Sequence, residues 1–172
     1  DIITASYNSN NTSVLLGNGN GTFGPQTDFA AGTKPLSVTL GDVNGDGLAD
    51  MIIGAPVEIA LRNGSYGPLT NNWACHSYVV FGQKDTITID LAQVAAGNGG
   101  FVIKGNVSGN FSFNDSLGTV LTGDELGFTV SSAGDVNGDG LADLLVGTRN
   151  GNKTYVVFGK TNGSAVEATA LE

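Results

Sequence analysis

One nine-residue pattern, Asp-x-Asn-Gly-Asp-Gly-x-x-Asp, occurs twice and constrains the fold more than any other feature of the sequence. It spans residues 42–50 and 135–143. Both copies lie in the longer stretch GDVNGDGLAD, which continues as MIIG in the first copy and as LLVG in the second. Self-similarity of this kind is typical of repeat architectures. We therefore expect recurring structural units in this chain.

The apolar segments of the chain are short and rich in β-branched residues, and most of them end at a glycine. Such segments predict strands, because helices need longer runs with a 3.6-residue period. Asn-Gly pairs recur between them, as at residues 18–19, 63–64 and 162–163, and both residue types tolerate the positive φ of tight hairpin turns. Apart from the end of the chain, we expect a helical turn only near residues 90–95. The predicted fold class is all-β.

A second match between the repeats gives the size of the unit. The sequence YVVFG occurs at residues 78–82 and again at residues 155–159, each time downstream of the acidic pattern. A unit then comprises a strand, the acidic loop and three further strands, and four strands per repeat is typical of a β-propeller blade. We predict about three four-stranded antiparallel blades that form an incomplete propeller.

The expected unit boundaries are approximately 1–35, 36–105 and 106–172. Asp1 aligns with Asp50 and Asp143, the last acidic residues of the two loops. The first unit is therefore predicted to lack its first strand and most of its acidic loop.

The acidic pattern has the composition of a binding site for a hard cation. Side chains that carry oxygen alternate along a short glycine-containing loop and can converge on one point, and Ca²⁺ accepts six to eight flexible oxygen ligands. Gly47 and Gly140 permit the sharp turn. We predict two Ca²⁺ sites, each completed by a backbone carbonyl, with the ligands Asp42, Asn44, Asp46, Leu48 and Asp50 in the first and Asp135, Asn137, Asp139, Leu141 and Asp143 in the second.

Two other interpretations of the acidic loops agree less well with the sequence. An EF-hand requires a glutamate at the twelfth loop position and flanking helices. This chain has Ile53 and Val146 there, and strands follow directly. The loops could also be acidic hairpin turns without a metal. Three aspartates around one point repel each other unless a cation neutralises them, which favours the metal.

The overall composition excludes several classes of function. The chain has 16 acidic and 7 basic residues and a net charge of −9, which argues against nucleic acid and anionic membrane surfaces as partners. No apolar stretch is long enough for membrane insertion. The single cysteine, Cys75, and the single histidine, His76, provide neither a disulfide nor a zinc site nor a catalytic triad. We therefore do not expect an enzyme.

These motifs resemble the FG-GAP / VCBS repeat family, the calcium-binding blades of integrin α-subunit-like β-propellers. The resemblance is carried by Leu126-Gly127-Phe128, by both acidic loops, by Val80-Phe81-Gly82 and Val157-Phe158-Gly159, and by the VCBS-like stretch 13–23. It implies an extracellular or cell-surface location and a propeller of about seven blades. Further blades would then come from a longer parent chain or from self-association.

The resemblance also implies a partner-binding face opposite the calcium loops. On that face the long segment 57–77 contributes three candidate contact residues, Arg62, Tyr66 and Trp73. An aromatic side chain on a long loop more often packs against its own blade than binds a partner. The partner class, an unknown protein or glycan, stays open.

Taken together, the sequence predicts a calcium-binding extracellular β-propeller repeat module for adhesion or ligand binding, in which Ca²⁺ is structural. The alternative is a non-catalytic accessory or carbohydrate-binding region of a larger secreted protein or enzyme.

Overall fold

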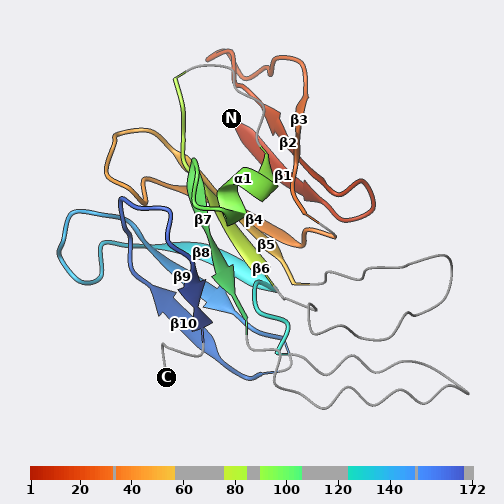
Figure 1. Cartoon of the computed structure of the whole chain (residues 1–172). Coiled ribbons are helices and arrows are strands. Elements are labelled where there is room, and N and C mark those ends of the chain that lie inside the picture. Colours follow the sequence, from red (N-terminus) through yellow and green to blue (C-terminus); the bar gives the residue numbers. More distant parts are fainter. Residues whose placement is uncertain (33, 57–75, 85–89, 106–123, 150, 169–172) are drawn as a thin grey trace, which may run out of the picture.

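A computed structural model describes residues 1–32, 34–56, 76–84, 90–105, 124–149 and 151–168 (Figure 1). These residues form three sheets and one short helix. The elements are β1 (Ile2–Ser6), β2 (Asn11–Leu15), β3 (Thr27–Ala30), β4 (Ser37–Gly41), β5 (Asp50–Ala55), β6 (His76–Val80), α1 (Leu91–Ala95), β7 (Gly100–Lys104), β8 (Thr129–Gly134), β9 (Asp143–Gly147), β10 (Thr154–Val157) and β11 (Val166–Glu167).

The central sheet has the strand order β11-β7-β6-β5-β4. Its four strands β4 to β7 follow one another in sequence and pair antiparallel. The helical turn expected near residues 90–95 is present as α1, and Asp90 caps it by accepting a hydrogen bond from the Ala92 amide at 2.9 Å.

The other two sheets have three strands each, in the orders β1-β2-β3 and β10-β9-β8. They lie on opposite sides of the central sheet (Figure 1). The described residues are thus mostly β, in antiparallel sheets, as the sequence predicts. None of these sheets closes on itself, and the blade count, the unit boundaries and the propeller stay predictions.

The C-terminal strand β11 departs from the expected four-stranded antiparallel pattern. It pairs parallel with β7 at the edge of the central sheet, with Val166 opposite Ile103. Val166 packs against the apolar core there, and Lys104 and Glu167 form an ion pair at 2.9 Å. These contacts stabilise β11 on the neighbouring unit's sheet, so the last sheet has three strands in the described residues.

The apolar core fills the spaces between the sheets. On one side of the central sheet, Ile52, Val79 and Phe101 pack against residues of the last sheet, including Leu144 and Val157. On its other side, Ile53, Val80, Val94 and Ala31 form a smaller cluster. The β5 residues Ile52 and Ile53 belong to different clusters because successive strand residues point to opposite faces of a sheet.

Gly54 of β5 lies against the backbone of Gly127, which precedes β8. A Cβ atom at this position would overlap the carbonyl oxygen of Gly127 and the hydroxyl of Ser37. We expect Gly54→Val to lower the free energy of unfolding by about 3 kcal/mol, because overpacking a tight contact forces the backbones apart. Urea unfolding followed by circular dichroism measures this effect.

The matched control for that substitution is Gly24→Val in the first unit. A Cβ atom there would approach the Leu16 carbonyl oxygen at 3.5 Å, an ordinary contact distance. Equal destabilisation by the two valines would contradict the tight packing assigned to Gly54.

Within the described residues, no helix has the length and apolar character needed to cross a membrane.

Candidate metal centre

The first acidic loop joins β4 to β5, and the Asp42 side chain organises its turn. Asp42 Oδ1 accepts hydrogen bonds from the amides of Gly45, at 2.8 Å, and Asp46, at 3.1 Å, and its Oδ2 accepts one from the Gly47 amide at 3.0 Å. Gly45 and Gly47 have φ values of +76° and +82°. Positive φ at both positions turns the amides toward the carboxylate, and glycine adopts it at little cost.

Asn44 and Asp46 form the outer part of this loop. Asn44 Oδ1 accepts a hydrogen bond from the Asp46 amide at 3.0 Å, and its Nδ2 donates to Asp46 Oδ2 at 2.9 Å. Asp46 Oδ1 accepts from the Leu48 amide at 2.8 Å. Asp46 is exposed to solvent, whereas Asn44 is half-buried.

Asp50 closes the loop from a fully buried position. Its Oδ2 accepts a hydrogen bond from the Val43 amide at 2.7 Å, and its Oδ1 accepts one from the Gly82 amide at 2.7 Å. The carboxylate therefore joins the start of the loop to the glycine that follows β6.

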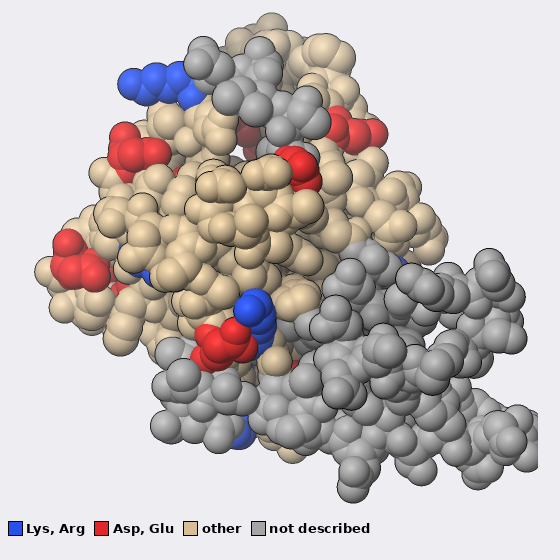
Figure 2. Space-filling model, viewed as in Figure 1, with Lys and Arg blue, Asp and Glu red and all other residues tan. Residues whose placement is uncertain are grey.

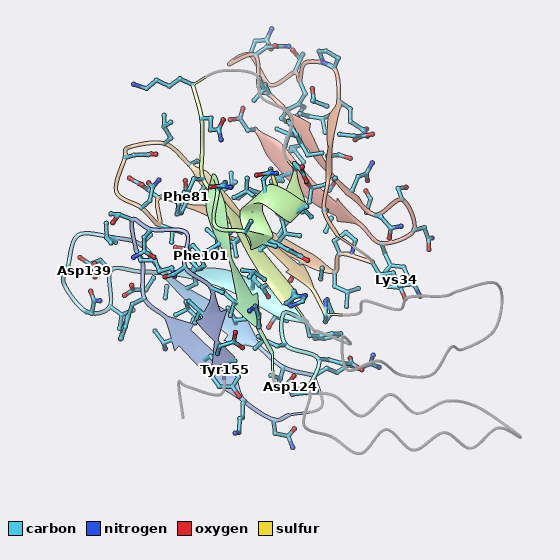
Figure 3. The ribbon with its side chains drawn as sticks, in the orientation of Figure 1. Lys34, Phe81, Phe101, Asp124, Asp139 and Tyr155 are labelled. Atoms are coloured by element: carbon cyan, nitrogen blue, oxygen red, sulfur yellow. The ribbon has the colours of Figure 1, made fainter. Side chains whose placement is uncertain are left out.

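The second acidic loop, between β8 and β9, repeats this network residue for residue. Asp135 accepts from the amides of Gly138, Asp139 and Gly140, and Asp139 accepts from Leu141. Asn137 bonds Asp139 through both ends of its amide. The buried Asp143 accepts from Val136 at 2.7 Å and from Gly159 at 2.9 Å. Figure 3 shows Asp139 at the tip of its loop, away from the core.

Asp1 makes a hydrogen bond equivalent to the one by which Asp50 and Asp143 each close an acidic loop. Its Oδ1 accepts from the Gly17 amide at 2.7 Å, as Asp50 accepts from Gly82. The alignment of Asp1 with the last acidic residue of the loop thus has a geometric counterpart.

Burial raises the pKa of the Asp50 carboxyl above its ordinary value. The amides of Gly82 and Val43 oppose this shift by stabilising the ionised form, and the negative charge of Asp46 adds to it. An ionised Asp50 is therefore costly in the chain alone, and a nearby cation would reduce that cost.

The donor set of each loop fits Ca²⁺ in chemical kind. It consists of carboxylate and amide oxygens, and an oxygen that accepts one N–H retains a lone pair for a cation. The carboxylates nevertheless turn toward the loop amides. In the described part of the chain, there is no group of three or more acidic, histidine or cysteine side chains that could hold a metal ion. The role of the Leu48 and Leu141 carbonyls as ligands stays a prediction.

Arg62, Tyr66 and Trp73, the predicted ligand contacts, lie outside the described residues. On the face seen in Figure 2, the charged side chains of the described residues are dispersed among uncharged ones.

Sequence reasoning missed two contributors to the acidic loops. The amides of Gly82 and Gly159 donate hydrogen bonds to Asp50 and Asp143, the aspartates that close the two loops. The Phe-Gly that ends both copies of YVVFG was the sequence signal that could have indicated these donors. The Ala142 amide donates to the Asp42 carbonyl at 2.9 Å, which brings the two loops together across the units. No sequence pattern indicated this second contact.

Two stretches of the chain match known family models. Residues 1–53 match a family model described as FG-GAP-like repeat, and residues 127–166 match one described as FG-GAP repeat. Each match includes one of the two acidic loops. A search of curated proteins finds no match to the chain. The two family matches support the FG-GAP repeat family.

Proposed function

We propose that this chain is a calcium-binding extracellular module of FG-GAP repeats, of the integrin-like and VCBS kind, that serves adhesion or ligand binding. One observation carries the proposal. Two loops of identical sequence pattern fold with the same hydrogen-bond network, and each presents two aspartates and an asparagine around one turn. FG-GAP repeats occur in integrin-like β-propeller domains and are typically extracellular, which is compatible with binding and with this location.

The role of the ion would be structural. Asp42, Asn44, Asp46 and Asp50, and in the second loop Asp135, Asn137, Asp139 and Asp143, would hold one Ca²⁺ each. Because each loop joins the first two strands of its unit, a bound ion would fix the loop and add binding free energy to folding. Extracellular calcium sites belong to the weaker class, which suits millimolar calcium outside cells.

Isothermal titration calorimetry of the calcium-free chain tests the proposal directly. We expect two bound Ca²⁺ ions per chain, and one after either Asp46→Ala or Asp139→Ala, because each substitution removes an exposed loop carboxylate. Asp28→Ala is the matched control, since it removes an equal charge from the first sheet. Absence of binding, or binding that neither loop substitution reduces, would contradict the calcium sites.

The ligand of the module is proposed only as a class, a protein or a glycan. The alternative is a non-catalytic accessory or carbohydrate-binding region of a larger secreted protein or enzyme, and its carbohydrate-binding form would use Tyr66 and Trp73. No described residue favours it over adhesion.

A further inference from the structure

Six Asn-Gly pairs lie in the described residues, and the structure gives them different surroundings. Such a pair can react within itself, because the amide nitrogen of the glycine can attack Cγ, the carbonyl carbon of the asparagine side chain. Glycine has no side chain to hinder the attack and allows the backbone to rotate. The six pairs are at residues 18–19, 20–21, 44–45, 98–99, 137–138 and 162–163.

The reaction needs water as its only co-reactant. A bond forms between the glycine nitrogen and Cγ, and the Cγ–Nδ2 bond breaks. The side-chain nitrogen leaves as ammonia, with the proton that the glycine amide loses. Water then opens the succinimide ring to aspartate or isoaspartate. Ring closure requires rotation of the backbone between the two residues, and hydrogen bonds to Oδ1 stabilise the negative charge that develops there.

The pair Asn20-Gly21 meets both requirements. Asn20 Oδ1 accepts two hydrogen bonds from Thr22, one from its amide at 3.0 Å and one from its hydroxyl at 2.6 Å. These donors act as an oxyanion hole would, and Oδ1 stays next to Thr22 in the ring, since Cγ is then bonded to the Gly21 nitrogen. All three residues are exposed, and nothing lies within 4 Å of the position of a Gly21 Cβ atom. Within the described residues, the Gly21 amide has no hydrogen-bond acceptor.

The acidic loops hold the same dipeptide in a closed arrangement. The Gly45 amide donates to Asp42 Oδ1 at 2.8 Å, and Asn44 bonds Asp46 through both ends of its side-chain amide. The second loop repeats these bonds around Asn137. Rotation of the glycine nitrogen toward Cγ would break all of them, so ring closure is opposed in both loops.

The pair Asn162-Gly163 has the donors without the freedom to rotate. Asn162 Oδ1 accepts from the Ser164 amide at 3.1 Å and from the Ser164 hydroxyl at 2.5 Å. Gly163, however, packs so closely on Gly97 that a Cβ atom would overlap the Gly97 carbonyl. This packing restricts the rotation that ring closure needs, which makes the pair an internal control for Asn20.

The remaining two pairs lack the donors. Asn18 Nδ2 donates to the Thr22 hydroxyl at 2.9 Å, and Asn98 Nδ2 donates to Gln93 Oε1 at 3.1 Å. In the described part of the chain, no donor contacts Oδ1 of either asparagine. Their side-chain nitrogens are held, and their carbonyls are not activated.

From these differences we propose that Asn20 is a site of self-modification, which converts to aspartate and isoaspartate ahead of the other five described pairs. Because the chain supplies every reacting group except water, the conversion needs no enzyme or cofactor. It adds a negative charge to the connection between β2 and β3 and spares Asn44 and Asn137 in the acidic loops. The reaction does not depend on calcium.

Site-resolved mass spectrometry of the full chain, incubated in mildly alkaline buffer with a chelator, measures the conversion at each asparagine. Electron-transfer fragmentation distinguishes isoaspartate from aspartate. We expect Asn20 to convert several-fold faster than Asn162, Asn44 and Asn137. In denaturant, where the folded contacts are lost, the rates should approach one another. A rate at Asn20 no higher than at these three residues in the folded chain would overturn the proposal.

Thr22→Val tests the contribution of the donors, because it removes the hydroxyl and keeps the shape of the side chain. The rate at Asn20 should fall several-fold, whereas Thr22→Ser should preserve it. Ser164→Ala is the matched control, since it removes the equivalent hydroxyl from Asn162 and should leave Asn20 unaffected. Circular dichroism confirms that each variant is folded. A rate at Asn20 that Thr22→Val leaves unchanged or raises would overturn the assigned activation.

Discussion

Replacement of Asp143 by alanine is expected to destabilise the calcium-free chain strongly. The substitution leaves the amides of Val136 and Gly159 without the carboxylate that accepts from them at 2.7 and 2.9 Å. A buried amide that loses its partner costs about 1–3 kcal/mol. The Gly159 amide is buried and the Val136 amide is partly buried, so the expected loss is about 3 kcal/mol. For a chain of this size, that corresponds to a fall of roughly 10 °C in melting temperature. Thermal unfolding in a chelator measures it.

The control lies in the same loop. Asp139 is exposed, and its Oδ1 accepts from the Leu141 amide at 2.9 Å. In Asp139→Ala this amide can bond to water, so the calcium-free chain should lose less than about 1 kcal/mol. If the two variants melted together in chelator, Asp143 would not be the structural closure of the loop.

The second large effect is stabilisation by calcium. A ligand that binds only the folded state at a concentration of ten times its Kd adds about 1.4 kcal/mol per site. Two such sites would add about 3 kcal/mol, a rise of roughly 10 °C in melting temperature. Differential scanning calorimetry with Ca²⁺ and then with excess chelator measures the rise and its reversal.

Asp46→Asn and Asp139→Asn separate this effect from general loop stability. Both side chains are exposed and would keep a carbonyl oxygen as an acceptor for the amides of Leu48 and Leu141. The double variant should melt close to the original chain in chelator but gain little from Ca²⁺. A full calcium-induced rise in this variant would place the ions elsewhere, and no rise in the original chain would exclude structural calcium.

The aspartates of one loop differ in their expected roles, in folding for the buried one and in calcium binding for the exposed one. The closing aspartates, Asp50 and Asp143, are buried and bond amides of two segments. The outer ones, Asp46 and Asp139, are exposed and bond only within the loop. We therefore expect loss of a closing aspartate to weaken folding even without calcium, and loss of an outer one to weaken calcium binding first.

The sequence predicted local features of the fold because local chemistry determines them. The strands follow from short β-branched runs, and α1 follows Asp90, whose side chain caps its first turn. The matching turns of the two loops follow from identical residues, since the hydrogen bonds that the loop amides donate to the Asp42 and Asp135 carboxylates each span five residues or fewer.

Only the tertiary structure decided how the units meet. The parallel pairing of β11 with β7 places Val166 opposite Ile103, which is distant in sequence, and a two-residue strand carries no periodicity from which to predict this pairing. The same holds for exposure. The repeats give Val43 and Val136 the same local sequence, yet Val43 is buried and Val136 is 60% exposed. Local sequence determines strand and turn, whereas burial depends on which neighbouring unit lies against the strand.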